Sequence, residues 1–217
     1  ATAVGGAIID SGNFDWSAHK DQFHGLTTPD PSYHGIVYTE KFGKTAYLVK
    51  ATVQLMRDFG STASPMNAFL LNIGLETLHL RIPRHCSNAQ AVAEYLAGHP
   101  KVAWVNYCGL PENKYHTLAR KYLPEGSCGM LTLGLKGGRD HAIRFMDALR
   151  LVSIVTHVAD VRSCVLHPAS HTHRQLSDEQ LVAAGVAPDL IRFSVGIEDI
   201  DDILADPGQA FAAVKAK

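Results

Sequence analysis

The sequence lacks several features that would assign it to a function class directly. It has no apolar run near the roughly 20 residues that a membrane-spanning helix needs. Its 20 basic and 21 acidic residues leave a net charge of −1, so it offers no strongly basic surface for nucleic acid or for an anionic membrane. It contains no Gly-x-Ser-x-Gly, P-loop or Gly-x-Gly-x-x-Gly motif, the signatures of common hydrolases and nucleotide-binding enzymes. We therefore expect neither a nucleic-acid partner nor a membrane partner.

Cysteine is also scarce, and its spacing excludes a disulfide framework. Cys86, Cys108, Cys128 and Cys164 show no close pairing and no Cys-x-x-Cys motif. In a chain of this length they indicate buried thiols in a reducing cytoplasm. The 217 residues, 46% of them hydrophobic, are enough to bury a core in one domain or in one and a part.

Hydrophobic periodicity predicts an α/β fold with helices on one face of a small sheet. Residues 1–10 are apolar and glycine-rich and are predicted to be a strand, followed by an irregular stretch up to residue 42. Ser64-Pro65 is typical of a helix start, and this long helix contains Pro83 and stops near Gly98. The remaining predicted strands are 102–107, 129–135, 161–166 and 190–196, and the remaining predicted helices are 43–59, 113–122, 140–149 and one that starts near 198.

The stretch Leu190 to Asp199 is the most informative of these strands. At a period of two, Ile191, Phe193 and Val195 share one face, and Arg192 lies on the other beside small residues. A guanidinium over a floor of small residues can hold a planar anion, because its fork matches a carboxylate in a bidentate manner. The alternative is an ordinary exposed arginine on an edge strand.

A second candidate site is the histidine cluster at His167, His171 and His173. Three imidazoles at this spacing could bind zinc, which would point to a metal-dependent hydrolase. The cluster contains no carboxylate, and Pro168 bends the chain within it. Histidines that make local hydrogen bonds at the end of a strand explain the same pattern.

Several motifs, taken together in their order and spacing, resemble the pyridoxal-phosphate-dependent enzymes of cysteine and methionine metabolism. The resemblance is greatest to the O-acetylhomoserine sulfhydrylase branch, on account of the long loop with Tyr33-His34-Gly35. It covers essentially the whole chain, but only the C-terminal half of the family's enzyme. The motifs are Gly5-Gly6-Ala7-Ile8-Ile9-Asp10-Ser11-Gly12, Ser64 to Leu71, Gly74 to Leu78, Trp104 to Pro111, His167-Pro168-Ala169-Ser170 and Arg192 to Asp199.

The resemblance implies a fold type I transferase that uses pyridoxal 5'-phosphate. Residues 1–66 would be a remnant of the large cofactor-binding domain with an active-site loop, 67–98 a connecting helix kinked at Pro83, and 99–217 the C-terminal α/β domain with a small, mainly antiparallel sheet. The Schiff-base lysine would lie upstream of Ala1 and the cofactor would be bound mainly by the N-terminal half. This chain would then contain no catalytic or cofactor-binding residue, and we expect it to be inactive alone. The parent would be a cytoplasmic homotetramer.

The implied reaction is γ-replacement in methionine biosynthesis: O-acetyl-L-homoserine and sulfide give L-homocysteine. The resemblance assigns the substrate carboxylate to Arg192 and places His157 beside it, where relatives carry Asn or Ser. Arg162 replaces a glutamate of some cystathionine-forming or cystathionine-cleaving relatives and favours a short nucleophile. Cys108 also departs from the usual residue, which we interpret as local drift. A cystathionine γ-synthase or methionine γ-lyase, the histidine-cluster hydrolase and a non-catalytic partner domain remain alternatives.

Overall fold

The computed structural model describes residues 2–214, which divide into two compact units with the boundary between Leu75 and Glu76. Each unit is described by itself. Among the described residues, no helix combines the length and the apolar character that crossing a membrane requires.

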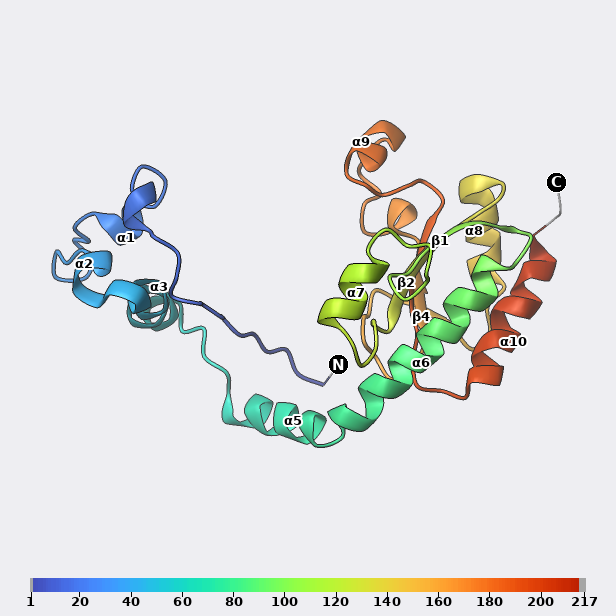
Figure 1. The fold of residues 1–217 in the computed structure, drawn as a ribbon, viewed down its shortest axis with the longest axis horizontal. Helices are drawn as coiled ribbons and strands as arrows, with labels where there is room; N and C mark the ends of the chain where they lie inside the picture. The colour runs from blue at the N-terminus through green and yellow to red at the C-terminus, as the bar shows by residue number, and fades with distance from the viewer. Residues whose placement is uncertain (1, 215–217) are drawn as a thin grey trace. The chain divides into compact units, whose positions relative to one another are not determined.

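The second unit, in which Figure 1 labels β1, β2 and β4, is built on one sheet, whose strands lie in the order β1-β2-β5-β4-β3. Its neighbours pair antiparallel except β3 and β4, which are parallel. The prediction of a small, mainly antiparallel sheet is therefore confirmed. The strands are β1 (Val102–Asn106), β2 (Met130–Leu135), β3 (Ser153–Ile154), β4 (Cys164–Leu166) and β5 (Leu190–Ser194).

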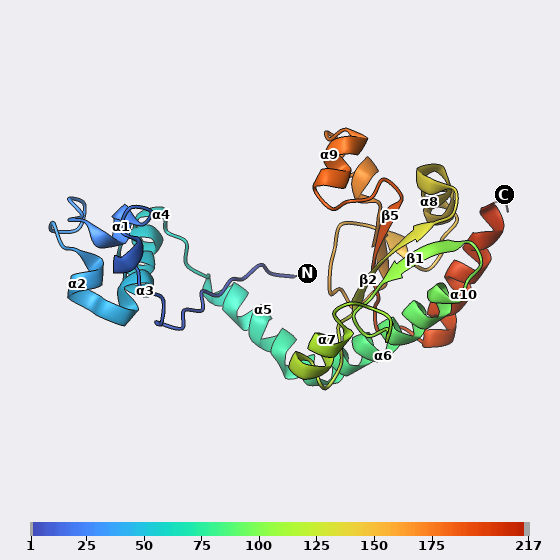
Figure 2. The same ribbon diagram turned by 45° about the horizontal axis from the view of Figure 1, so that its top comes forward.

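Three helices cover one face of this sheet and enclose the main core (Figures 1 and 2). They are α6 (Leu78–Ala97), α8 (Gly138–Asp147) and α10 (Ile200–Ala210). Ile191, Phe193 and Val195 are fully buried in that core, so the predicted alternation of β5 is confirmed. The smaller elements of this unit are α7 (His116–Tyr122), η4 (Pro168–Ser170), α9 (Asp178–Ala183) and η5 (Phe211–Ala213).

The first unit consists of short helical segments. A small cluster of Leu26, Tyr38 and Ala46 is buried at their centre. The predicted helix 43–59 is present, but its middle is a π-helix. The segments are η1 (Ser17–His19), α1 (His24–Thr27), α2 (Tyr38–Phe42), η2 (Gly43–Thr45), α3 (Ala46–Lys50), η3 (Ala51–Met56, the π-helix), α4 (Arg57–Phe59) and α5 (Pro65–Glu76).

Two local predictions differ from the structure. Residues 2–10 form no strand, since their backbone finds no neighbouring strand among the described residues and a strand needs one. The predicted long helix is divided into α5 and α6 at Thr77, whose φ of −111° and ψ of 6° are not helical. Pro83 lies inside α6. The predicted start holds, because the Ser64 hydroxyl accepts the backbone N–H of Asn67 at 3.2 Å.

Candidate substrate-carboxylate site

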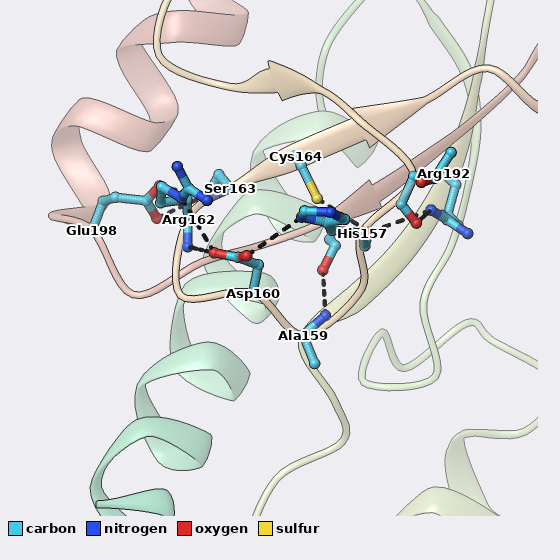
Figure 3. A network of polar contacts seen from close by, with 10 residues as sticks. His157, Ala159, Asp160, Arg162, Ser163, Cys164, Arg192 and Glu198 are labelled. Carbon is cyan, nitrogen blue, oxygen red and sulfur yellow. Dashed lines mark hydrogen bonds and ion pairs between the residues drawn. The ribbon is translucent and has the colours of Figure 1, made fainter. Parts of the chain in front are cut away.

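Arg192 lies on the face of β5 that points away from the main core. Thr132 on β2 and Leu166 on β4 are its register partners. Its half-buried side chain is oriented by two backbone carbonyls, because Nη2 donates to Thr156 O at 2.8 Å and to His157 O at 3.3 Å (Figure 3). No partner of its Nε or Nη1 is found among residues 2–214. A guanidinium held by one nitrogen keeps its other donors available for an anion.

The loop that supplies these carbonyls is itself fixed to the sheet. The Cys164 thiol on β4 donates to His157 O at 3.2 Å, and burial raises the pKa of this thiol, which keeps it a donor. The backbone N–H of Ala159 donates to the Ser194 hydroxyl at 3.1 Å. Ala159 has a φ of 55°, a conformation that a non-glycine residue adopts only where its surroundings impose it. Arg192 is therefore oriented by a loop pinned to β4 and β5.

A charged cluster follows in the same loop. His157 is half exposed, and its Nδ1 lies 3.5 Å from Asp160 Oδ2 (Figure 3). Asp160 also accepts the backbone N–H of Arg162 at 3.0 Å and its Nε–H at 3.3 Å. These donors lower the pKa of Asp160, so its carboxylate stays ionised beside the imidazole. The Arg162 side chain is 74% exposed.

Glu198 binds Ser163, the residue that follows Arg162 at the end of this loop. Its carboxylate accepts the backbone N–H of Ser163 at 2.5 Å and the Ser163 hydroxyl at 3.0 Å. The same hydroxyl accepts the backbone N–H of Gly196 at 2.8 Å. An added Cβ at Gly196 would overlap the Glu198 carboxylate and the backbone of Val161 and Ser163. The glycine therefore lets the end of β5 approach the loop closely.

The cavity beside this cluster is too small to hold a cofactor. The cavity lined by His157, Asp160 and Cys164 has about 70 Å³, against about 300–1,000 Å³ for small-molecule sites. No lysine lines it. Lys50 borders a cavity of about 350 Å³ in the first unit, but its ammonium pairs with Asp30 at 2.8 Å. These residues therefore do not fit pyridoxal phosphate by themselves.

The histidine cluster is occupied by local hydrogen bonds. His167 is buried, with Nδ1 at 2.8 Å from the Ser170 hydroxyl and Nε2 at 2.9 Å from Pro188 O. The Nδ1 atoms of His171 and His173 lie at hydrogen-bond distance from the hydroxyls of Ser170 and Thr172. Within residues 2–214, no group of three or more His, Cys, Asp or Glu could hold a metal ion. The metal-hydrolase alternative finds no support in this arrangement.

The structure brings together the two residues that the sequence analysis singled out and adds several that it missed. Arg192 and His157 meet, although the contact runs through the backbone carbonyl of His157 and not through its ring. Ser194 is not among the missed residues, because the strand alternation already places it on the Arg192 face. Asp160 and the pairing of Ser163 with Glu198 gave no local signal, because Glu198 is 35 residues away from Ser163.

Comparison with known proteins gives consistent matches. The model of the family described as "Cys/Met metabolism PLP-dependent enzyme" matches residues 1–212. A homocysteine synthase of Schizosaccharomyces pombe is 49% identical over 209 residues, covering 96% of this chain and 49% of the relative. An O-acetyl-L-homoserine sulfhydrylase of Leptospira meyeri is 45% identical over 218 residues, with 96% and 49% covered. The chain thus spans about half the length of the curated relatives it matches.

Solved structures with similar folds belong to similarly named proteins. A putative O-acetylhomoserine (thiol)-lyase of Campylobacter jejuni, determined with N'-pyridoxyl-lysine-5'-monophosphate, superposes with a TM-score of 0.78 at 40% identity, covering 88% of this chain and 45% of that one. An O-acetylhomoserine sulfhydrylase of Wolinella succinogenes superposes with a TM-score of 0.67 at 33% identity, with 93% and 50% covered.

Proposed function

The chain belongs to the pyridoxal-phosphate-dependent enzymes of cysteine and methionine metabolism, and we propose that it forms part of an O-acetyl-L-homoserine sulfhydrylase. The proposed reaction makes L-homocysteine from O-acetyl-L-homoserine and sulfide. The similarity to the homocysteine synthase of S. pombe and to the O-acetyl-L-homoserine sulfhydrylase of L. meyeri supports this choice. When bound, pyridoxal phosphate supplies an electron sink for the carbanion chemistry that removes the γ-substituent.

The observation that carries the proposal is the orientation of Arg192. Its guanidinium is held on one nitrogen by the carbonyls of Thr156 and His157. We assign to its remaining donors the α-carboxylate of the amino-acid substrate, because a charge-assisted, bidentate pair fixes both position and orientation. The His157 ring itself lies against the Asp160 carboxylate, and we propose that it borders the bound substrate.

Arg162 bears on the choice of nucleophile. Its cationic side chain lines the small cavity next to His157 and contacts Asp160. A cation there suits a short anionic nucleophile such as hydrosulfide better than an amino acid, whose ammonium group it would repel. This distinguishes the proposal from a cystathionine γ-synthase, the nearest alternative within the family.

The rest of the proposed enzyme follows from the family. Residues 1–66 would belong to the cofactor-binding domain, 67–98 to a connecting segment and 99–217 to the C-terminal domain of a cytoplasmic homo-oligomer. We expect the chain to be inactive alone, because it spans about half the length of the curated relatives it matches. A purified chain that makes homocysteine when supplied with cofactor and both substrates would contradict this.

The test is a set of arginine variants in the whole enzyme, assayed for homocysteine formation. A charge-assisted hydrogen bond is worth about 1.5–3 kcal/mol, so Arg192→Ala should lower kcat/KM by roughly 10- to 150-fold. The kcat/KM of Arg192→Lys should lie between those of Arg192→Ala and the wild type, since lysine keeps the positive charge and loses the two-pronged guanidinium. The exposed Arg144 of α8 gives a matched control, and Arg144→Ala should keep kcat/KM within about twofold.

His157→Asn separates the roles of ring and backbone. The carbonyl of residue 157 still accepts from Arg192 in this variant, so kcat/KM should change by less than about threefold. An Arg192→Ala enzyme with unchanged kcat/KM would overturn the proposed site. Unchanged turnover of O-acetyl-L-homoserine with L-cysteine in place of sulfide would instead favour the cystathionine γ-synthase alternative.

A further inference from the structure

Cys164 on β4 and Ser194 on β5 form a cross-strand pair beside the loop that orients Arg192. The two are register partners, and each is only 2% exposed. Strand alternation places Ser194 on the same face of β5 as Arg192. Side chains this buried do not touch a substrate, so we expect any effect that they have on the reaction to pass through other residues.

The pair supplies one donor and one acceptor to the backbone of the loop. The Cys164 thiol donates to His157 O at 3.2 Å, and the backbone N–H of Ala159 donates to the Ser194 hydroxyl at 3.1 Å (Figure 3). Burial raises the pKa of the Cys164 thiol, which keeps it protonated near neutral pH. His157 O also accepts from Arg192 Nη2 at 3.3 Å. One carbonyl therefore links the thiol to the guanidinium.

The two ends of the loop are fixed by backbone hydrogen bonds that do not involve this pair. The N–H of Val155 donates to Val165 O at 3.1 Å, and the N–H of Ile197 donates to Val161 O at 2.8 Å. Between these ends, residues 156–159 are tied to the sheet by the thiol, the hydroxyl and the guanidinium. Removing the thiol or the hydroxyl should therefore loosen the middle of the loop and leave the sheet intact.

The backbone of Ala159 gives the loop a reason to move when these bonds are lost. Its φ of 55° lies in the left-handed region, which a non-glycine residue occupies only under a constraint. The hydrogen bond to Ser194 is such a constraint. Without it the backbone can relax towards negative φ, and the carbonyls of Thr156 and His157 would then shift relative to Arg192.

We propose that Ser194 and Cys164 are positioning residues for the substrate carboxylate, which act on Arg192 through the carbonyls of the loop. This inference rests on the proposed function of Arg192. The position of the guanidinium matters, because a bidentate pair with a carboxylate requires a defined orientation. Each of the two side chains supplies one neutral hydrogen bond, and such a bond corresponds to roughly 3- to 10-fold in an equilibrium constant.

Separate measurement of KM and kcat for homocysteine formation by the whole enzyme tests the proposal. Ser194→Ala and Cys164→Ala should each raise the KM for O-acetyl-L-homoserine roughly 3- to 10-fold and keep kcat within about twofold, since a contact made equally in the ground and transition states affects KM alone. A variant that merely folds less well loses active enzyme, which lowers the apparent kcat and leaves KM unchanged. Cys164→Ser keeps a donor and should return KM to within about twofold of the wild type. Cys86→Ala, which removes a half-buried thiol of α6, is the matched control and should leave both constants within about twofold.

A double-mutant cycle shows whether the effect passes through Arg192. In the Arg192→Ala enzyme, Ser194→Ala should change kcat/KM by less than about twofold, because the guanidinium on which it acts is gone. An equal loss in both backgrounds would overturn the inference, as would a wild-type KM in both Ser194→Ala and Cys164→Ala while Arg192→Ala loses activity. An Arg192→Ala enzyme with unchanged kcat/KM would instead overturn the proposed function, and this inference with it, so the two failures can be told apart.

Amide hydrogen exchange gives a readout that does not depend on activity. In Ser194→Ala, peptides that contain Ala159 should exchange faster than in the wild type, because the N–H of Ala159 loses its acceptor. Peptides from β4 and β5 should stay as protected as in the wild type. Loss of protection throughout β4 and β5 would show that Ser194 supports the sheet and not the loop, and would overturn the proposed role.

Discussion

The two units of this chain differ in how their apolar side chains are used. In the second unit, residues of β2, β5, α6, α8 and α10 form one continuous buried core. In the described part of the first unit, the buried apolar cluster consists of Leu26, Tyr38 and Ala46. The helix α5 has no buried residue, and Met66, Phe69 and Leu75 are each about 60% exposed. Burial of apolar area therefore stabilises the second unit much more.

The first unit depends instead on ring contacts and on an ion pair. Trp16 packs edge-on against Phe23 at 5.0 Å and stacks on Tyr47 at 5.5 Å. Lys50 pairs with Asp30 and lies 4.6 Å from the centre of the Tyr38 ring. Such contacts are worth about 0.5–2 kcal/mol each. The family model therefore matches both units, although only the second has an extensive buried apolar core.

The largest expected effect comes from truncating a core phenylalanine. Phe193 is fully buried in β5, so Phe193→Ala should lower the free energy of unfolding of the second unit by about 3–5 kcal/mol. Amide hydrogen exchange in the peptides that cover β2 and β5 measures this loss.

The matched change in the first unit is Phe69→Ala on α5. Phe69 is 59% exposed, so the effect should stay within about 0.5 kcal/mol. A loss comparable to that of Phe193→Ala would break the comparison, because it would mean that further protein covers α5 in solution.

The same substitution at two glycines should have opposite signs. Gly196→Ala drives a Cβ into the Glu198 carboxylate and nearby backbone, and overpacking of this kind costs about 1–3 kcal/mol. Gly74 lies inside α5 with no atom within 4 Å of an added Cβ, so Gly74→Ala should stabilise its helix by about 0.5–1 kcal/mol. Thermal melts of the two variants measure both changes, and a destabilising Gly74→Ala would contradict the open surface of α5.

The sequence predicts some features of the fold and of the candidate site and misses others. The period-two pattern predicted β5 and the face of Arg192, because one side of that strand is buried. It could not predict that Nη2 contacts Thr156 and His157, since those carbonyls are 36 and 35 residues away. β3 was missed because it has only two residues, both exposed. The helix α9 was missed although Ser177 and Gln180 form a capping box, a signal that sequence does carry.

Protonation of one group in each unit, His167 and Asp30, should change stability by a smaller amount than the substitutions above, and over a different pH range in each unit. In the second unit, burial lowers the pKa of His167, whose Nδ1 lies 2.8 Å from the Ser170 hydroxyl. The imidazole of His167 therefore binds a proton more readily in the unfolded chain, where its pKa is near the ordinary value of 6.5. The stability that the neutral, buried His167 contributes is present above that pH and is lost as the pH falls below it. His167→Gln should therefore approach the wild-type melting temperature as the pH is lowered from 8 to 5, whereas a gap that widens would show that the charged imidazole is stabilising.

In the first unit the corresponding group is Asp30. The ammonium of Lys50 and then the hydroxyl of Ser32 lower the pKa of Asp30 to about 2 from an ordinary value of 3.8. The ionised carboxylate therefore stabilises this unit above about pH 4, and the contribution is lost as the pH falls from there towards 2. The melting temperatures of Asp30→Asn and wild type should differ at pH 5 and converge near pH 2, while the exposed Asp58 should give a small gap when changed to Asn. Because the first unit has so little buried apolar area, the Lys50–Asp30 pair should be a larger share of its stability than any surface ion pair is in the second unit. A difference in melting temperature between Asp30→Asn and wild type that stays constant from pH 5 to 2 would show that this ion pair contributes nothing.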